Sequence, residues 1–151
     1  PQNRRHASRT ARLNTWLVTE FGKTHEIRVQ LPLTLGSHSE PEPDFALVRF
    51  EVADAAPRHP GSADLVLEIA DSSLAFDRNE KASLYAKAGI AEYWVLNLVN
   101  SRLEVRRGPA ENDELAYGWG YSSLTILAPG QVVSPLFAEG VSFAVSELLG
   151  L

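Results

Sequence analysis

Two carboxylates in this chain stand where a carboxylate needs a partner. Glu68 interrupts the apolar run 65–69, which predicts a buried strand, and Asp44 follows Pro43 at the start of another predicted strand. Burying an unpaired ionised carboxylate costs several kcal/mol, so Glu68 requires a cation, a metal or a strong donor. Two carboxylates at adjacent strand ends can hold Mg²⁺ or Mn²⁺ and leave sites for the oxygens of a substrate phosphate. This pair predicts metal-dependent phosphodiester hydrolysis.

A lysine follows at a spacing that could bring it to the same place. Lys81 lies in the first turn of a predicted helix, and Asp77 and Tyr85 stand four residues before and after it. The three share one helix face, so Lys81 can orient a water or stabilise charge on the phosphate if this face covers the strand end. Asp77, with Glu80 three residues later, predicts the helix N-cap, and Tyr85 either supports the site or packs in the core.

Each of these residues also has a structural interpretation. Asp44 fits a polar turn residue after proline, Lys81 a solvated helix residue, and Glu68 one half of a structural ion pair with Lys81. A catalytic site and a structural pair predict the same contact between Glu68 and Lys81. The sequence favours the catalytic interpretation because of the following resemblance.

Four segments carry the resemblance: Pro43–Asp44, Leu67–Ser73, Asp77 with Lys81, and Tyr85–Trp94, which includes a Gly-x-x-Glu-Tyr-Trp motif. They resemble the Uma-two family of restriction-type endonucleases, a largely bacterial family placed in the PD-(D/E)XK nuclease superfamily. The resemblance implies metal binding by Asp44 and Glu68, with the main-chain carbonyl of Ile69 as a third ligand. The superfamily lysine stands two residues after the acid on the same strand, where this chain has Ala70. The resemblance implies that Lys81 replaces it from the helix.

The elements that must position these residues follow from hydrophobic periodicity. We expect an α/β fold with a restriction-endonuclease-like mixed central β-sheet flanked by α-helices, formed by residues 1–151 as a single domain that lacks its natural N-terminal segment. The family tends to carry a glutamate in that segment. The expected helices are 6–21, 77–89 and a turn at 145–149; the expected strands are 27–34, 45–50, 63–70, 91–99, 102–106, 121–127 and 141–144; and loops are expected at 36–43 and 53–62.

Charge and composition limit the partners. The net charge of −5 argues against coating nucleic acid by bulk electrostatics, but Arg5, Arg9 and Arg12 recur at helical spacing and could meet a phosphate backbone, or form a solvated helix face. No segment is long and apolar enough to cross a membrane, and no secretion signal is evident, so we expect a cytoplasmic protein. The absence of Cys excludes disulfides and thiolate metal sites.

Two groups of residues are assigned structural roles. The four histidines, at positions 6, 25, 38 and 59, show no metal-ligand spacing, so we expect surface or structural positions for them. Tyr93 and Trp94 open an apolar strand and are expected in the core rather than stacked on bases.

The sequence thus predicts a Mg²⁺- or Mn²⁺-dependent endonuclease that acts on DNA, by analogy double-stranded, with a homodimer as the simplest way to cut both strands. The alternative is a catalytically inactive nuclease-fold module that binds protein or nucleic acid, which Ala70 and the acidic net charge favour. The sequence does not separate DNA from RNA or branched DNA as substrate.

Overall fold

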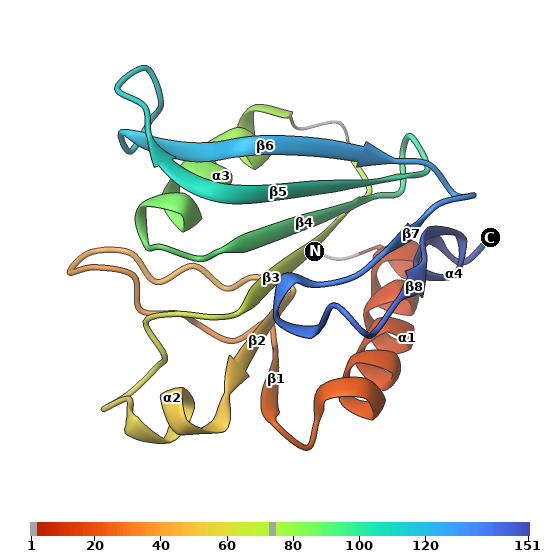
Figure 1. Ribbon diagram of the computed structural model, residues 1–151, viewed down its shortest axis with the longest axis horizontal. Coiled ribbons are helices and arrows are strands. Elements are labelled where there is room, and N and C mark those ends of the chain that lie inside the picture. Colours follow the sequence, from red (N-terminus) through yellow and green to blue (C-terminus); the bar gives the residue numbers. More distant parts are fainter. Residues whose placement is uncertain (1–2, 73–74) are drawn as a thin grey trace.

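A mixed six-stranded sheet forms the centre of the protein in the computed structural model, which describes residues 3–72 and 75–151 (Figure 1). The strands lie in chain order; β3 and β4 are parallel and all other neighbours are antiparallel. The predicted sheet flanked by helices is therefore confirmed. The sheet strands are β1 (His25–Val29), β2 (Phe45–Arg49), β3 (Leu65–Ala70), β4 (Glu92–Asn97), β5 (Arg102–Glu111) and β6 (Trp119–Leu127).

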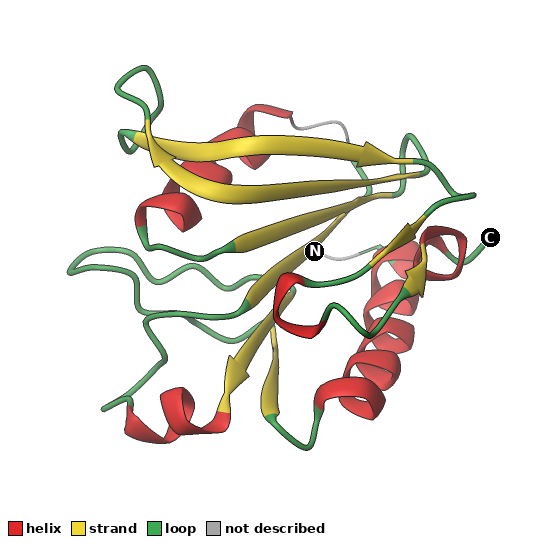
Figure 2. Ribbon diagram, viewed as in Figure 1, coloured by secondary structure: helices red, strands yellow, loops and turns green. Residues whose placement is uncertain are grey.

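Helix α1 (Arg4–Phe21) covers one face of this sheet (Figure 2). It begins at Asn3, whose side chain accepts a hydrogen bond from the His6 N–H and so satisfies an unpaired donor of the first turn. Leu13, Leu17 and Phe21 recur every four residues, are buried, and pack against the inward side chains of the strands. No described helix is long and apolar enough to cross a bilayer.

Helix α3 (Ala75–Lys87) covers the other face, as the connection between the parallel strands β3 and β4. Successive residues of β3 point to opposite faces, so Leu67 joins the core under α1 while Val66 joins the core under α3, together with Tyr85. Glu68 therefore faces α3. This alternation decides which helix can supply a partner for the carboxylate.

The remaining elements complete the two layers. They are α2 (Phe50–Ala55), the pair β7 (Val132–Val133) and β8 (Phe143–Ala144), the 3₁₀ turn η1 (Leu136–Ala138), and α4 (Val145–Leu149). Tyr93 and Trp94 are buried in β4, which confirms the prediction that they belong to the core.

The structure corrects three predicted boundaries. β1 ends at Val29 rather than continuing to residue 34, because Gln30 adopts a left-handed φ of 54° that ends the extended backbone. α2 occupies the beginning of the segment expected as a loop; with six residues, it is too short to show a helical period. α3 begins at Ala75, so Asp77 lies in its first turn and the predicted N-cap is wrong. The side chain of Asp77 lies outside the described residues.

Candidate active site

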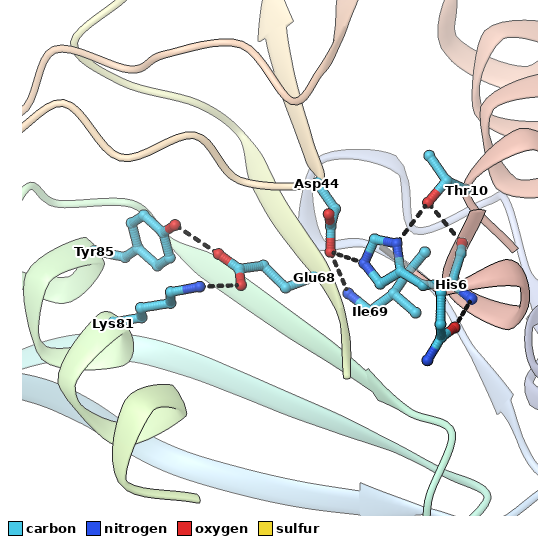
Figure 3. A network of polar contacts seen from close by, with 8 residues as sticks. His6, Thr10, Asp44, Glu68, Ile69, Lys81 and Tyr85 are labelled. Carbon is cyan, nitrogen blue, oxygen red and sulfur yellow. Dashed lines mark hydrogen bonds and ion pairs between the residues drawn. The ribbon is translucent and has the colours of Figure 1, made fainter. Parts of the chain in front are cut away.

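The candidate site lies at a fork between β2 and β3. The antiparallel pairing of these strands ends at Phe45 and Leu67, whereas β3 continues beside β4 as far as Ala70. Asp44 lies immediately before β2, and its side chain takes the place of a strand partner: Asp44 Oδ2 accepts the Ile69 N–H at 2.8 Å (Figure 3). The end of the β2–β3 ladder thus brings an acidic side chain to the edge of β3.

A histidine of α1 reaches the same carboxylate oxygen. His6 Nε2 lies 3.1 Å from Asp44 Oδ2, and both side chains are largely buried. Thr10 holds the first turn by donating to the His6 carbonyl at 2.9 Å. The sequence predicts a surface or structural position for His6, and the structure buries it beside Asp44. The available signal was position: His6 precedes Leu13 by two helical turns and shares the buried face of α1.

Glu68 receives two donors from α3. Lys81 Nζ lies 2.9 Å from Oε2, and the Tyr85 hydroxyl donates to Oε1 at 2.8 Å (Figure 3). The Glu68 side chain is 13% exposed and that of Lys81 38%, so the ammonium approaches from the solvent side. The structure therefore brings together the two residues that the sequence predicted to meet, with Tyr85 on the same helix face.

Burial sets the protonation behaviour of this group. Loss of solvent raises the pKa of Glu68 above its usual value, and the charge of Asp44 adds to the rise, while Lys81 and the Tyr85 hydroxyl oppose it. Burial, followed by the charge of Glu68, raises the pKa of Tyr85, so its hydroxyl stays protonated and can donate. The two donors thus stabilise the ionised form of Glu68 and offset part of the desolvation cost of its burial.

The oxygen atoms around the fork suit a hard divalent cation. The described residues contain no group of three His, Cys, Asp or Glu side chains that could hold a metal, but Mg²⁺ commonly uses one or two carboxylates together with waters and substrate oxygens. In the described part of the chain, both donors to Asp44 reach Oδ2. The Ile69 carbonyl faces the same side of β3 as its N–H, which points at Asp44. Asp44, Glu68 and this carbonyl could therefore hold Mg²⁺ or Mn²⁺.

A small pocket of about 100 Å³ opens beside Glu68. Ala70 is part of its wall, and so is Lys81. Arg78, which is not among the predicted site residues, also lines the pocket. The spacing could have predicted this, because Arg78 lies three residues before Lys81 and Lys81 four before Tyr85, which places all three on one face of α3. The lining residues are Glu68, Ile69, Ala70, Asp71, Ser72, Arg78, Lys81 and Val95.

The three arginines of α1 that were predicted to meet nucleic acid, Arg5, Arg9 and Arg12, do not line this pocket. The Arg5 guanidinium donates to the Leu98 carbonyl at 2.6 Å, and Arg9 packs against Gly150, so both help to fasten α1 to the rest of the fold. Arg12 is exposed. Their contact with nucleic acid stays a prediction.

Comparison with known proteins agrees with the fold. A crystal structure of "a putative nuclease belonging to DUF820" from Anabaena variabilis superimposes with a TM-score of 0.78 at 16% identity, covering 99% of this chain and 82% of that one. The type IIG restriction endonuclease BpuSI gives a TM-score of 0.46 at 21% identity over 68% of this chain and 11% of its own, too low to bear on the fold. No curated protein matches the sequence. Residues 1–146 match the Uma2 family, described as "Putative restriction endonuclease", and the chain belongs to this family.

Proposed function

We propose that this protein is a metal-dependent endonuclease that hydrolyses phosphodiester bonds of DNA, with Asp44, Glu68 and Lys81 as its catalytic centre. The observation that carries the proposal is the buried carboxylate of Glu68, which meets Lys81 at 2.9 Å beside the fork where Asp44 begins β2. Membership of a family of restriction-type endonucleases supports it.

The residues of the site divide the chemistry among them. When bound, Mg²⁺ or Mn²⁺ would polarise the phosphate and lower the pKa of a water molecule. Asp44 and Glu68 would hold the cation, together with the Ile69 carbonyl. The Lys81 ammonium would orient the attacking water and stabilise negative charge on the phosphate. Because both Glu68 oxygens already receive donors, Lys81 must share this carboxylate with the metal or shift toward the phosphate.

The main alternative is a nuclease-fold module without activity. Ala70, where the strand lacks the superfamily lysine, and the acidic net charge favour this alternative. The contact between Lys81 and Glu68 weakens the first reason, because an ammonium reaches the carboxylate from α3 instead. A pair kept only for structure would also be less stable than packed apolar side chains in many cases, so its retention is easier to explain by metal binding.

Calorimetry followed by cleavage tests the proposal. Binding of Mg²⁺ and Mn²⁺ would be measured on the wild type, Asp44→Ala and Glu68→Ala, and then cleavage of plasmid DNA by the same proteins. We expect binding and cleavage in the wild type and loss of both in the two variants. Asp64→Ala is the matched control, because Asp64 is a partly buried carboxylate that pairs with His25 before β3 begins, at the end away from the fork. A wild type that binds neither metal and leaves DNA intact would establish the inactive module.

The substrate and assembly are further parts of the proposal. We infer double-stranded DNA as substrate and a two-fold dimer as the cutting form, because one site on each strand gives a double-strand break. Matched DNA and RNA duplexes would be compared as substrates, and light scattering with and without DNA would give the mass of the complex. If the protein cleaves only the RNA duplex, RNA is the substrate instead of DNA.

A further inference from the structure

Helix α3 brings a second cation into the pocket beside Glu68. Arg78 lies one turn before Lys81, and both line the same pocket of about 100 Å³. This pocket is open to solvent and has room for waters or a compact anion. The Arg78 side chain is 17% exposed, so its guanidinium lies mostly inside the protein while reaching this opening.

The guanidinium of Arg78 has donors that its surroundings do not use. Its Nε and Nη1 atoms are buried and have no hydrogen-bond partner among the described residues. Among the described residues its ion-pair partner is Glu104, whose Oε1 lies 3.5 Å from Nε, longer than the roughly 2.7–2.9 Å typical of a charge-assisted bond. A buried donor of a charged group that lacks a hydrogen-bond partner carries a desolvation cost. An anion bound beside Arg78 would offset this cost by accepting from the guanidinium.

Glu104 does not need Arg78 as its counter-ion. Arg106 Nη1 lies 3.0 Å from Glu104 Oε1, and the Asn97 side chain donates to Oε2 at 3.1 Å. Lys81 and the Tyr85 hydroxyl donate to the two oxygens of Glu68, and Arg78 Nε and Nη1 make no hydrogen bond to this carboxylate. Arg78 therefore shares Glu104 with Arg106, and it lines the pocket together with Lys81, Glu68 and Asp71.

We propose that Arg78 binds a backbone phosphate of the nucleic-acid substrate in this pocket, next to the metal-binding carboxylates. The inference rests on the proposed nuclease function for the identity of the pocket. A guanidinium presents paired N–H donors that match two oxygens of a phosphate, whereas an ammonium acts as a point charge. Arg78 would then hold the substrate while Lys81 acts on the reacting phosphate.

Binding to DNA without cleavage tests this role. A fluorescent 20-base-pair duplex would be titrated with metal-free protein across a range of salt concentrations, using the wild type, Arg78→Lys and Arg78→Gln. Loss of one phosphate contact should reduce the slope of log affinity against log salt by about 1 in Arg78→Gln. We expect its affinity at low salt to fall about 10-fold or more, with a smaller loss in Arg78→Lys, which keeps the charge. Lys87→Gln, an exposed cation in the last turn of the same helix, should change neither value.

Two further measurements separate this role from a structural one. The double variant Arg78→Gln/Glu104→Gln removes both charges of the long ion pair. It should lose stability in urea unfolding, because Arg106 loses its counter-ion, and the folded protein should still show the reduced salt slope. Recovery of wild-type DNA affinity in the double variant, or an unchanged slope in Arg78→Gln, would overturn the proposal. Mg²⁺ binding by calorimetry should be unchanged in Arg78→Gln. If the wild type neither binds metal nor cuts DNA while the slope still falls in Arg78→Gln, the catalytic proposal fails and the phosphate contact stands.

Discussion

His6 Nε2 lies 3.1 Å from Asp44 Oδ2 across 38 positions of sequence, and this contact joins the first turn of α1 to the start of β2. The same oxygen accepts the Ile69 N–H, so Asp44 is held from two sides. Residues that hydrogen-bond to a metal ligand fix its orientation and contribute to the affinity of the site. His6 is thus a positioning residue for one of the proposed ligands.

Replacing His6 should weaken metal binding. We expect His6→Ala to lower Mg²⁺ affinity about 10–100-fold, because Asp44 loses the group that orients it. Calorimetry on the folded variant provides the measurement. His25→Ala is the control: His25 also contacts a carboxylate, Asp64 at 2.7 Å, but away from the fork, so its loss should lower stability and leave metal affinity intact. Equal metal affinity in His6→Ala and the wild type would reduce His6 to a structural role.

Lys81 should be needed for cleavage and not for metal binding. Removing one group that stabilises transition-state charge typically costs about 10²–10³-fold in rate, so Lys81→Ala should cleave plasmid at least about 100-fold more slowly. Ala70 lies two residues after Glu68 on β3 and faces the same side. Adding Ala70→Lys to the Lys81→Ala variant should restore part of the rate, since it places an amine on the face of β3 that also carries Glu68. Full activity of Lys81→Ala would remove this residue from the catalytic centre.

The raised pKa of Glu68 predicts a pH dependence of stability in the absence of metal. Above the ordinary carboxyl pKa the unfolded chain releases this proton while the folded protein retains it, so the folded state binds more protons. The contribution of Glu68 to the free energy of unfolding should therefore fall as pH rises from about 4.5 through the raised pKa. Urea unfolding at several pH values should show this slope in the wild type and not in Glu68→Gln. The same slope in both proteins would contradict the shift.

The hydroxyl of Tyr85 should matter for both stability and protonation. Tyr85→Phe leaves Glu68 Oε1 without its buried donor and should cost about 1–3 kcal/mol in urea unfolding. Because this hydrogen bond lowers the pKa of Glu68, the acid limb of the cleavage profile should move to higher pH. Tyr121→Phe is the control, since it removes a hydroxyl that donates to the Ile90 carbonyl at 2.7 Å outside the site. That variant should lose stability without a change in the profile.

Glu92 of the Gly-x-x-Glu-Tyr-Trp motif should be structural. It is fully buried and accepts hydrogen bonds from Trp94 Nε1 and Arg107 Nε, both at 2.7 Å, and from the Leu136 N–H at 2.9 Å. It thus ties β4 and β5 to the segment after β7. Removing Glu92 leaves the Trp94 indole N–H and the Leu136 N–H without their acceptor, so Glu92→Ala should lower the free energy of unfolding by about 2–4 kcal/mol. Unchanged stability would show that the motif serves another purpose.

The sequence by itself determined the main elements and half of the site. Periodicity reports which side of a helix or strand is buried, and that pattern is local, so α1, β3 and α3 could be predicted from it. A carboxylate inside an apolar strand requires a partner, and Lys81 and Tyr85 share one helix face, so their meeting with Glu68 followed from spacing together with the resemblance.

Only the tertiary structure decided which further residues meet at the candidate site. His6 meets Asp44, and Arg78 enters the pocket beside Glu68, because of how α1 and α3 pack on opposite sides of the fork. The end of the β2–β3 ladder depends on strand register, and no local pattern encodes it. Contacts across 38 positions depend on the relative placement of whole elements, which is fixed by core packing and hydrogen-bond pairing rather than by the residues next to them in the chain.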